Sequence, residues 1–243
     1  MRHYRPVDSF DEAAAEIYDD EVRGDEGATV AFLAERARGG AVLELAVGTG
    51  RIALPLAATG VRVDGVDLST HMVAKLRAKP GGELLSVTIG DFADVPVDGR
   101  YALIYVVYNT LFNLINQDDQ VRCFENVARH LTDDGCFVIE AFVPTYLVRL
   151  RDDQYVDAEH VGVDRVILDV GRHDPVAQLL EESHVHLTAK GTTLYPIVCR
   201  YAWPSELDLM ARLAGLRLIE RWADWERTPF SSTSRNHISV YGR

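Results

Sequence analysis

Cysteine and cationic residues are scarce in this sequence, and each shortage argues against one class of protein. Only three cysteines occur among 243 residues, Cys123, Cys136 and Cys199, all in apolar stretches. An odd number in such surroundings favours buried free thiols and a reducing compartment over a disulfide framework. Lys and Arg number 25 against 37 Asp and Glu, a formal net charge of -12. Because this charge repels a phosphate backbone and no basic stripe offsets it, we expect no nucleic-acid partner.

Long apolar runs are absent as well. No stretch approaches the roughly 20 apolar residues that a bilayer-spanning helix needs. The segment Met1 to Asp11 is polar and charged, without the apolar core of a signal peptide. We therefore expect a cytoplasmic protein without a membrane partner. No repeat, low-complexity segment or linker is visible, and the length suits one α/β domain that carries an insertion.

Short apolar runs alternate with helical stretches between Ala41 and Phe142, which is the pattern of a parallel sheet buried on both faces. The expected strands are Ala41 to Ala46, Val61 to Val66, Leu84 to Ile89, Tyr101 to Val107 and Cys136 to Phe142. The expected helices between them are Thr49 to Ala58, Thr70 to Ala78 behind an N-cap at Ser69, and Asp118 to Leu131. This rhythm predicts a doubly wound α/β core.

The flanking regions have patterns of their own. Ser9 and Glu12 have the spacing of a capping box, which predicts a helix from Phe10 through Tyr18, and a second helix should end at Gly39-Gly40. After Pro144 a strand-turn-strand rhythm predicts a three-stranded antiparallel insertion. The chain then returns with a helix from Pro204 to Gly215 and two strands, Leu216 to Trp222 and His237 to Tyr241.

The segment Val42 to Gly50 is an apolar strand that ends in a glycine turn before a helix. Glycines at such a turn let the backbone approach a ligand, because no Cβ blocks it. Gly48 to Ala53 fits the Gly-x-Gly-x-x-Gly/Ala fingerprint, and Asp67 ends the next strand about 20 residues later, where a ribose-binding acid is expected. This pattern alone does not distinguish NAD from S-adenosylmethionine (SAM).

Glu44 discriminates better between these ligands. An acid in a buried parallel strand is costly unless it is paired or hydrogen-bonded, and Glu44 lies four residues before Gly48. It could support the glycine loop and face the ammonium end of an amino-acid ligand. The alternative is a structural acid satisfied by backbone amides.

These residues resemble the class I SAM-dependent methyltransferases, whose first motif has an acid in the strand followed by Gly-x-Gly-x-Gly, here with Ala46 in place of the first glycine. Val66 to Met72 looks like the second motif, which implies that Asp67 binds the ribose hydroxyls. Gly90-Asp91-Phe92 resembles the segment that contacts the adenine. The cofactor-binding residues implied are Glu44, Ala46, Gly48, Gly50, Asp67, Leu68, Met72, Asp91, Phe92 and Val107.

The resemblance spans Gly39 to Phe142 and Pro204 to Arg243, and it implies a mostly parallel seven-stranded sheet. The insertion and Tyr18-Asp19 look similar to the small-molecule branch that includes glycine and amino-sugar N-methyltransferases. The function implied is methyl transfer from SAM to nitrogen or oxygen of a small molecule, in natural-product or amino-sugar metabolism. The corresponding parts are an N-terminal helical lid (1–38), a SAM-binding core (39–145), a substrate-covering insertion (146–203) and a closing helix with strands (204–243).

The acceptor pocket should lie at the carboxyl ends of the strands, where open α/β sheets bind ligands. The candidates are Tyr18, Tyr108, Asn109 and Asn113, although the asparagines could be loop amides that bond nearby backbone. His160, His173 and His237 are possible bases, but none is singled out as catalytic. His184 and His186 share a strand face without a complete ligand set, so we expect no metal.

Two other functions share some of these features. A NAD(P)-dependent oxidoreductase would also use Gly48 to Ala53 and Asp67, but Glu44 and the antiparallel C-terminal end argue against it. A non-catalytic SAM-binding protein could retain the whole fold. DNA adenine methylation is disfavoured because Tyr108-Asn109-Thr110 lacks the Asn/Asp-Pro-Pro-Tyr motif. The sequence leaves the acceptor open, and the exposed edge of the insertion could pair two copies into a homodimer.

Overall fold

A seven-stranded sheet forms the centre of the protein, and its strand order is β10-β11-β5-β4-β1-β2-β3. The computed structural model describes residues 4–20 and 23–243. Strands β1 to β5 are parallel, while β11 runs antiparallel to both β5 and β10. The strands are β1 Val42–Leu45, β2 Val63–Asp67, β3 Ser86–Ile89, β4 Tyr101–Val106, β5 Leu131–Phe142, β10 Arg217–Trp222 and β11 Asn236–Gly242. The predicted doubly wound α/β fold is confirmed.

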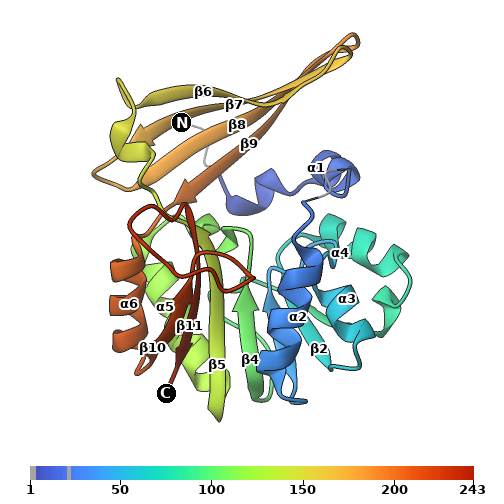
Figure 1. Cartoon of the computed structure of the whole chain (residues 1–243). Helices are drawn as coiled ribbons and strands as arrows, with labels where there is room; N and C mark the ends of the chain where they lie inside the picture. The colour runs from blue at the N-terminus through green and yellow to red at the C-terminus, as the bar shows by residue number, and fades with distance from the viewer. Residues whose placement is uncertain (1–3, 21–22) are drawn as a thin grey trace.

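Helices cover both faces of this sheet, as Figure 1 shows. They are α2 Glu26–Ala37, α3 Ala53–Ala58, α4 Thr70–Ala78, α5 Gln117–His130 and α6 Pro204–Leu213. Alternate residues of one strand pack against different layers: Val42 of β1 belongs to the cluster with Phe32 of α2, and Leu43 to the cluster with Phe124 of α5. This two-sided burial explains why the strands read as continuous apolar runs.

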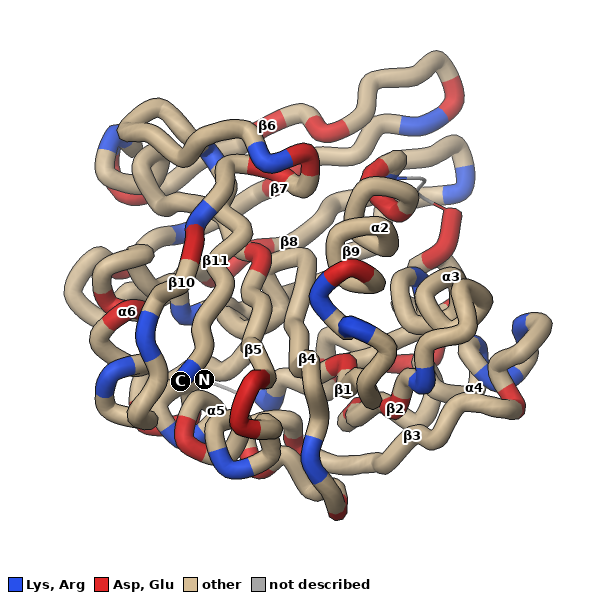
Figure 2. The backbone as a smooth tube through the Cα atoms, turned by 60° about the horizontal axis from the view of Figure 1, so that its bottom comes forward, with Lys and Arg blue, Asp and Glu red and all other residues tan. Residues whose placement is uncertain are grey.

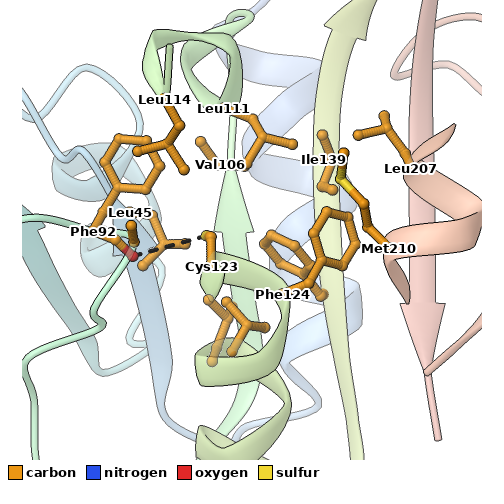
Figure 3. Packing of buried hydrophobic residues seen from close by; sticks show 14 of the residues in the cluster. Leu45, Phe92, Val106, Leu111, Leu114, Cys123, Phe124, Ile139, Leu207 and Met210 are labelled. Atoms are coloured by element: carbon orange, nitrogen blue, oxygen red, sulfur yellow. Dashed lines mark hydrogen bonds between the residues drawn. The ribbon is translucent and has the colours of Figure 1, made fainter. Parts of the chain in front are cut away.

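The buried side chains of α5, including Cys123 and Phe124, pack in the middle of the larger cluster (Figure 3). The ring of Phe124 meets Phe137 edge-on at 5.3 Å between centroids, and each such buried side chain contributes roughly 1.5–3 kcal/mol through burial. Cys123 donates its thiol to the carbonyl of Phe92 at 3.8 Å. The packing of α5 therefore fixes the chain just after β3, where Asp91 lies.

The insertion is a separate antiparallel sheet of four strands, not the predicted three. Its strands are β6 Gln154–Val161, β7 Arg165–Asp174, β8 Leu179–Thr188 and β9 Gly191–Arg200, and they pair in chain order. The strand missed is β6, which is exposed along nearly all of its length and therefore lacks the apolar alternation that marks a half-buried strand. In Figure 1 this sheet lies over the end of the core to which the arrow of β4 points.

The N-terminal region differs from the sequence expectation in its capping. A short 3-10 helix, η1 (Pro6–Ser9), precedes α1 (Glu12–Ile17), and the N-cap is Asp11, whose carboxylate accepts from the amide of Ala14 at 2.9 Å. The predicted Ser9 cap is wrong, because the hydroxyl of Ser9 instead donates to the carbonyl of Pro196 on β9 at 2.6 Å. Residues 1–3 and 21–22 of the predicted lid lie outside the described residues.

The other differences between the predicted and the observed structure concern where helices and strands begin. The helix predicted from Thr49 begins only at Ala53, because the glycine turn continues through Ile52. Strand β5 starts at Leu131, five residues before the predicted Cys136.

Figure 2 shows Lys and Arg scattered among acidic residues over the described chain, without a continuous basic stripe. None of the described helices has both the length and the apolar character to span a bilayer.

Candidate functional site

A cavity of about 500 Å³ is lined by three parts of the chain: the carboxyl ends of the core strands, the N-terminal residues 6–18 together with Arg23, and the insertion sheet. This volume is within the range of ~300–1,000 Å³ typical of small-molecule sites. The predicted residues that line it are Tyr18, Ala46, Gly48, Asp67, Leu68, Met72, Asp91, Phe92, Tyr108, Asn109 and Asn113. Glu44, Gly50 and Val107 were also predicted to contact cofactor, and they are not part of the lining.

The loop after β1 bends through left-handed backbone conformations. Ala46 has a φ of 56° and Gly48 also has 56°, while Gly50 has 79°. Glycine takes these angles easily, whereas alanine at Ala46 accepts a strain of about 1 kcal/mol. At Gly50 an added Cβ would lie 2.9 Å from the Cγ of Leu54 and 3.0 Å from that of Leu76. Gly50 is therefore required for helix packing behind the loop.

Asp67 joins the end of β2 to this loop. One carboxylate oxygen accepts from the amide of Gly48 at 2.7 Å, and the other accepts from the amide of Ser69 at 2.8 Å. Burial raises the pKa of Asp67, and these backbone amides oppose that effect. Each oxygen keeps a further lone pair. Asp67 is thus a fixed acceptor at the cavity wall.

Glu44 lies behind the loop on the face of the sheet that α2 and α3 cover. It is 3% exposed and accepts the hydroxyl of Tyr105 at 2.8 Å. Burial raises its pKa to about 8, against the opposing effect of Tyr105 and the amide of Ala53. The structure therefore does not support direct contact between Glu44 and a ligand in the cavity, because the side chain points into the helix layer. Its position agrees with support of the glycine loop.

An apolar slot with a polar end forms the next part of the wall. Leu68 and Met72 follow β2, and Phe92 follows β3. Asp91 lies beside them, with one carboxylate oxygen accepting from the amide of Ala93 at 2.8 Å. A flat, mainly apolar ring system with one polar edge suits such a slot.

The turn after β4 holds two consecutive left-handed residues, Tyr108 with a φ of 55° and Asn109 with 62°. Glu140 of β5 holds this turn: its carboxylate accepts from the amide of Tyr108 at 2.8 Å and from the indole of Trp225 at 3.1 Å. The side-chain oxygen of Asn109 accepts from the amide of Phe142 at 2.7 Å. Sequence reasoning missed Glu140, although an acid in a buried strand is the signal that had identified Glu44.

Two arginines border the loop after β1 and the turn after β4. The guanidinium of Arg23, which lines the cavity, lies 4.1 Å from the ring centre of Tyr108 and 4.7 Å from that of Tyr18. Arg51 lies 5.4 Å from the ring of Tyr108 and is paired with Asp25 at 2.6 Å. Such contacts place positive charge against aromatic faces. Sequence analysis singled out neither arginine, because neither belongs to a motif.

The N-terminal segment is tied to both neighbouring parts of the chain. Asp19 accepts the hydroxyl of Thr49 at 2.6 Å and pairs with Lys79 at 2.7 Å. The hydroxyl of Ser69 donates to the carbonyl of Phe10 at 2.5 Å. On the other side, the Ser9 bond to β9 connects the segment to the insertion. The segment therefore closes one side of the cavity.

Comparisons with known proteins identify the fold and its family. A methyltransferase domain family matches residues 42–135. The structure of the CcbJ methyltransferase from Streptomyces caelestis superimposes with a TM-score of 0.91 at 39% identity, covering 98% of this chain and 99% of that one. The chain belongs to the SAM-dependent methyltransferases.

Two curated relatives of this methyltransferase are Streptomyces proteins. The cypemycin N-terminal methyltransferase of Streptomyces sp. is 26% identical, covering 96% of this chain and 97% of the relative. The dTDP-3-amino-3,6-dideoxy-alpha-D-glucopyranose N,N-dimethyltransferase of Streptomyces fradiae is 27% identical, covering 58% and 60%. Methyltransferases with SAM bound are among the structures that share the fold at lower identity. The predicted family, enzyme class and cofactor are confirmed.

The five histidines that the sequence analysis considered fall into two groups. His160, His173 and His237 are not in the cavity lining. His173 is buried beside the hydroxyl of Tyr201 at 2.9 Å, and His237 is buried beside Ser239 at 2.8 Å. Burial lowers the pKa of His237 to about 3. Each of these two interior histidines makes one ring hydrogen bond, while Nδ1 of His173 and Nε2 of His237 are buried without a hydrogen-bond partner among the described residues.

His184 and His186 do line the cavity, from β8 of the insertion. Nδ1 of His184 lies 2.6 Å from Asp169 on β7 and 3.5 Å from Glu159 on β6. The hydrogen bond to Asp169 raises the pKa of His184 to about 9. These three side chains are close enough to hold a metal ion together, but a metal needs the neutral imidazole. At neutral pH the pairing favours the imidazolium and hence an ion-paired group.

Proposed function

We propose that this methyltransferase transfers the methyl group of SAM to an amine nitrogen of a small natural product or amino sugar. The observation that carries this proposal is one cavity with hydrogen-bond acceptors at the strand ends on one side and carboxylates of the insertion on the other. Among the described residues, Arg23 is the one Lys or Arg in its lining. An acidic wall favours a basic acceptor over an acidic one. One of these two relatives is named an N-terminal methyltransferase and the other an N,N-dimethyltransferase, which supports transfer to nitrogen.

The residues present fit SAM in this cavity. We infer that the fixed oxygens of Asp67 accept from the ribose hydroxyls, since each carboxylate oxygen is oriented by a backbone amide. Leu68, Met72 and Phe92 form the slot for the adenine, with Asp91 at its polar edge. The guanidinium of Arg23 is placed to receive the amino-acid carboxylate. When bound, SAM supplies an electrophilic methyl group.

The turn Tyr108-Asn109 and the ring of Tyr18 would then hold the acceptor near that methyl group. Glu140 and the amide of Phe142 fix the turn from behind. Positioning of two reactants can supply about 7–11 kcal/mol of a barrier, so an amine acceptor needs little more than orientation and a free lone pair. Asn113, whose side-chain oxygen lies 3.5 Å from the thiol of Cys199, completes this wall beside the insertion.

Acceptor pairs in which only one member carries a free amine test the proposal. The protein is first titrated with SAM and S-adenosylhomocysteine by calorimetry. It is then incubated with SAM and dTDP-3-amino-3,6-dideoxy-alpha-D-glucopyranose or the analogue with a 3-hydroxyl, and with a peptide carrying a free or an acetylated N-terminus. Mass spectrometry should show methylation of a free amine only. Methylation of the hydroxyl analogue without the amine would contradict nitrogen specificity.

Three further expectations accompany this proposal. We propose that the chain divides into a lid (1–38), a core (39–145), an insertion (146–203) and a closing segment (204–243). Limited proteolysis tests this division, because cleavage should occur first near these boundaries. We propose a homodimer through the edge of the insertion, which light scattering during size-exclusion chromatography tests. Three buried free cysteines fit the cytoplasm, and cell fractionation tests that location.

A further inference from the structure

Strand β8 presents a row of ionisable side chains to the cavity. Glu182, His184 and His186 alternate with residues on the opposite face, as side chains of a strand must. The neighbouring Glu181 lies on the outer face, where it pairs with Arg172 at the surface. The row is therefore a property of one face of β8, and Glu181 gives an internal comparison for Glu182.

Glu182 is oriented by a contact that crosses a neighbouring strand. The hydroxyl of Tyr155, on β6, donates to the Glu182 carboxylate at 2.6 Å. Between them lies Gly171 of β7, which is the register partner of both residues. A Cβ at Gly171 would lie 2.3 Å from a ring carbon of Tyr155. The glycine thus leaves the space through which the Tyr155 ring reaches Glu182.

The remaining bonding capacity of Glu182 faces the cavity. Among the described residues, Tyr155 is the one hydrogen-bond partner of its carboxylate. Its neighbour His184 is already engaged by Asp169 at 2.6 Å. An ionised carboxylate can accept several hydrogen bonds. Glu182 therefore has acceptor capacity for a donor inside the cavity, whereas the proton on His184 is held by Asp169.

We propose that Glu182 binds the ammonium group of the acceptor and takes one of its protons, with Tyr155 as the positioning residue that aims the carboxylate. This inference rests on the proposed transfer to an amine. The proton moves from the ammonium nitrogen to a Glu182 oxygen, and the nitrogen lone pair becomes free. That pair forms the bond to the methyl carbon, while the electron pair of the broken C–S bond stays on sulfur.

The surroundings of Glu182 favour this proton transfer. Burial raises its pKa and disfavours an ammonium group in the same cavity, so the two proton affinities approach each other. The charged and titratable groups around it are Tyr155 on β6, Asp169 on β7, His184 on β8, Cys199 on β9, and Tyr146 after β5. The imidazolium of His184 pairs with Asp169 at 2.6 Å, lies 3.5 Å from Glu159 on β6, and partly opposes the raised pKa of Glu182. Among the described residues, no ion pair within 4 Å engages the Glu182 carboxylate itself.

The test uses E182Q, Y155F and the matched control E181Q in the full chain. Gln at position 182 keeps the size of the side chain and an oxygen for Tyr155 but removes the charge. Each variant is first titrated with S-adenosylhomocysteine, and equal affinities show that the fold and the cofactor site are intact. Benzylamine and its neutral counterpart benzyl alcohol are then titrated into the loaded protein. The wild type and E181Q should prefer benzylamine about tenfold or more, and E182Q should lose that preference.

The rate of benzylamine methylation gives a second measurement. E182Q should methylate benzylamine about 10²-fold more slowly, or slower still, at pH 7. This deficit should shrink as the pH rises towards the pKa of benzylamine, because the amine has then already lost its proton in solution. Y155F should fall between E182Q and the wild type. A wild type without preference for benzylamine, an E182Q indistinguishable from E181Q, or a deficit that does not depend on pH overturns the proposal. Methylation of benzyl alcohol alone instead overturns nitrogen transfer itself.

Discussion

Replacement of Asp67 by Asn tests the cofactor site most directly, because the same carboxylate holds the loop and faces the cavity. Asn offers one side-chain oxygen where the carboxylate offers two. The amides of Gly48 and Ser69 both donate to this group, so the new NH2 group must face one of these donors. Since the residue is 7% exposed, an unmet amide costs about 1–3 kcal/mol. Burial raises the pKa of Asp67, so loss of the charge returns part of that cost.

We therefore expect D67N to lose about 1 kcal/mol of unfolding free energy, at the lower end of this range. SAM affinity should fall further, by about 10- to 100-fold, because the hydroxyls of the ribose lose a charged acceptor. Calorimetry with S-adenosylhomocysteine and urea unfolding measure the two effects. D134N, at an exposed aspartate of β5, is the control. Unchanged affinity in a folded D67N protein would refute the assignment of Asp67 to the ribose.

Three further predictions concern stability. G50A should lose about 2 kcal/mol or more of unfolding free energy in urea, because its Cβ would lie 2.9 Å from Leu54 and the residue has a φ of 79°. A variant as stable as the wild type would contradict this and show that α3 and α4 can move apart. E44Q should be more stable than the wild type at pH 8 and above. The folded-state pKa of Glu44, about 8, exceeds that of an unfolded glutamate, so the unfolding free energy of the wild type should fall as the pH rises from about 4.5 through 8. A wild-type stability that grows relative to E44Q with rising pH would contradict the reasoning. His237 has a folded-state pKa of about 3, so unfolding free energy should decline, by at most ~5 kcal/mol, as the pH falls from 6.5 towards 3; NMR titration of its imidazole checks the cause, and protonation near pH 6.5 in the folded state would disprove it.

The strands of the core and the cofactor end of the cavity could be predicted from sequence because both depend on short-range patterns. The glycine turn follows β1, Asp67 ends β2 and Asp91 comes two residues after β3, and parallel strands bring their carboxyl ends to one edge. Helix α4 was predicted with both of its ends and with its cap, because Ser69 accepts from the amide of Met72 within a single turn. Local chemistry was sufficient in these places.

The insertion wall could not be predicted, because its composition depends on register between strands. Glu182 meets Tyr155 only through the glycine at position 171, and His184 meets Asp169 only because these residues are register partners. A shift of one residue would turn every one of these side chains to the other face. The alternation of polar and apolar residues within β8 alone does not reveal which residues of β7 lie opposite. The Ser9 capping box failed for a related reason, since a long-range bond to β9 engages its hydroxyl.

Two acids in buried strands explain how the strained loops of the cavity keep their shape. Left-handed Ala46 follows Glu44 by two residues, and the Glu44 carboxylate accepts from the amide of Ala53 where the glycine turn ends. Left-handed Tyr108 and Asn109 lie in the turn whose Tyr108 amide donates to Glu140. Neither glutamate is in the described cavity lining, so their burial is not explained by contact with ligand. Unusual backbone angles persist where the surroundings over-determine them. The carboxylates thus act through the loops, and their loss should disturb cofactor and acceptor geometry together.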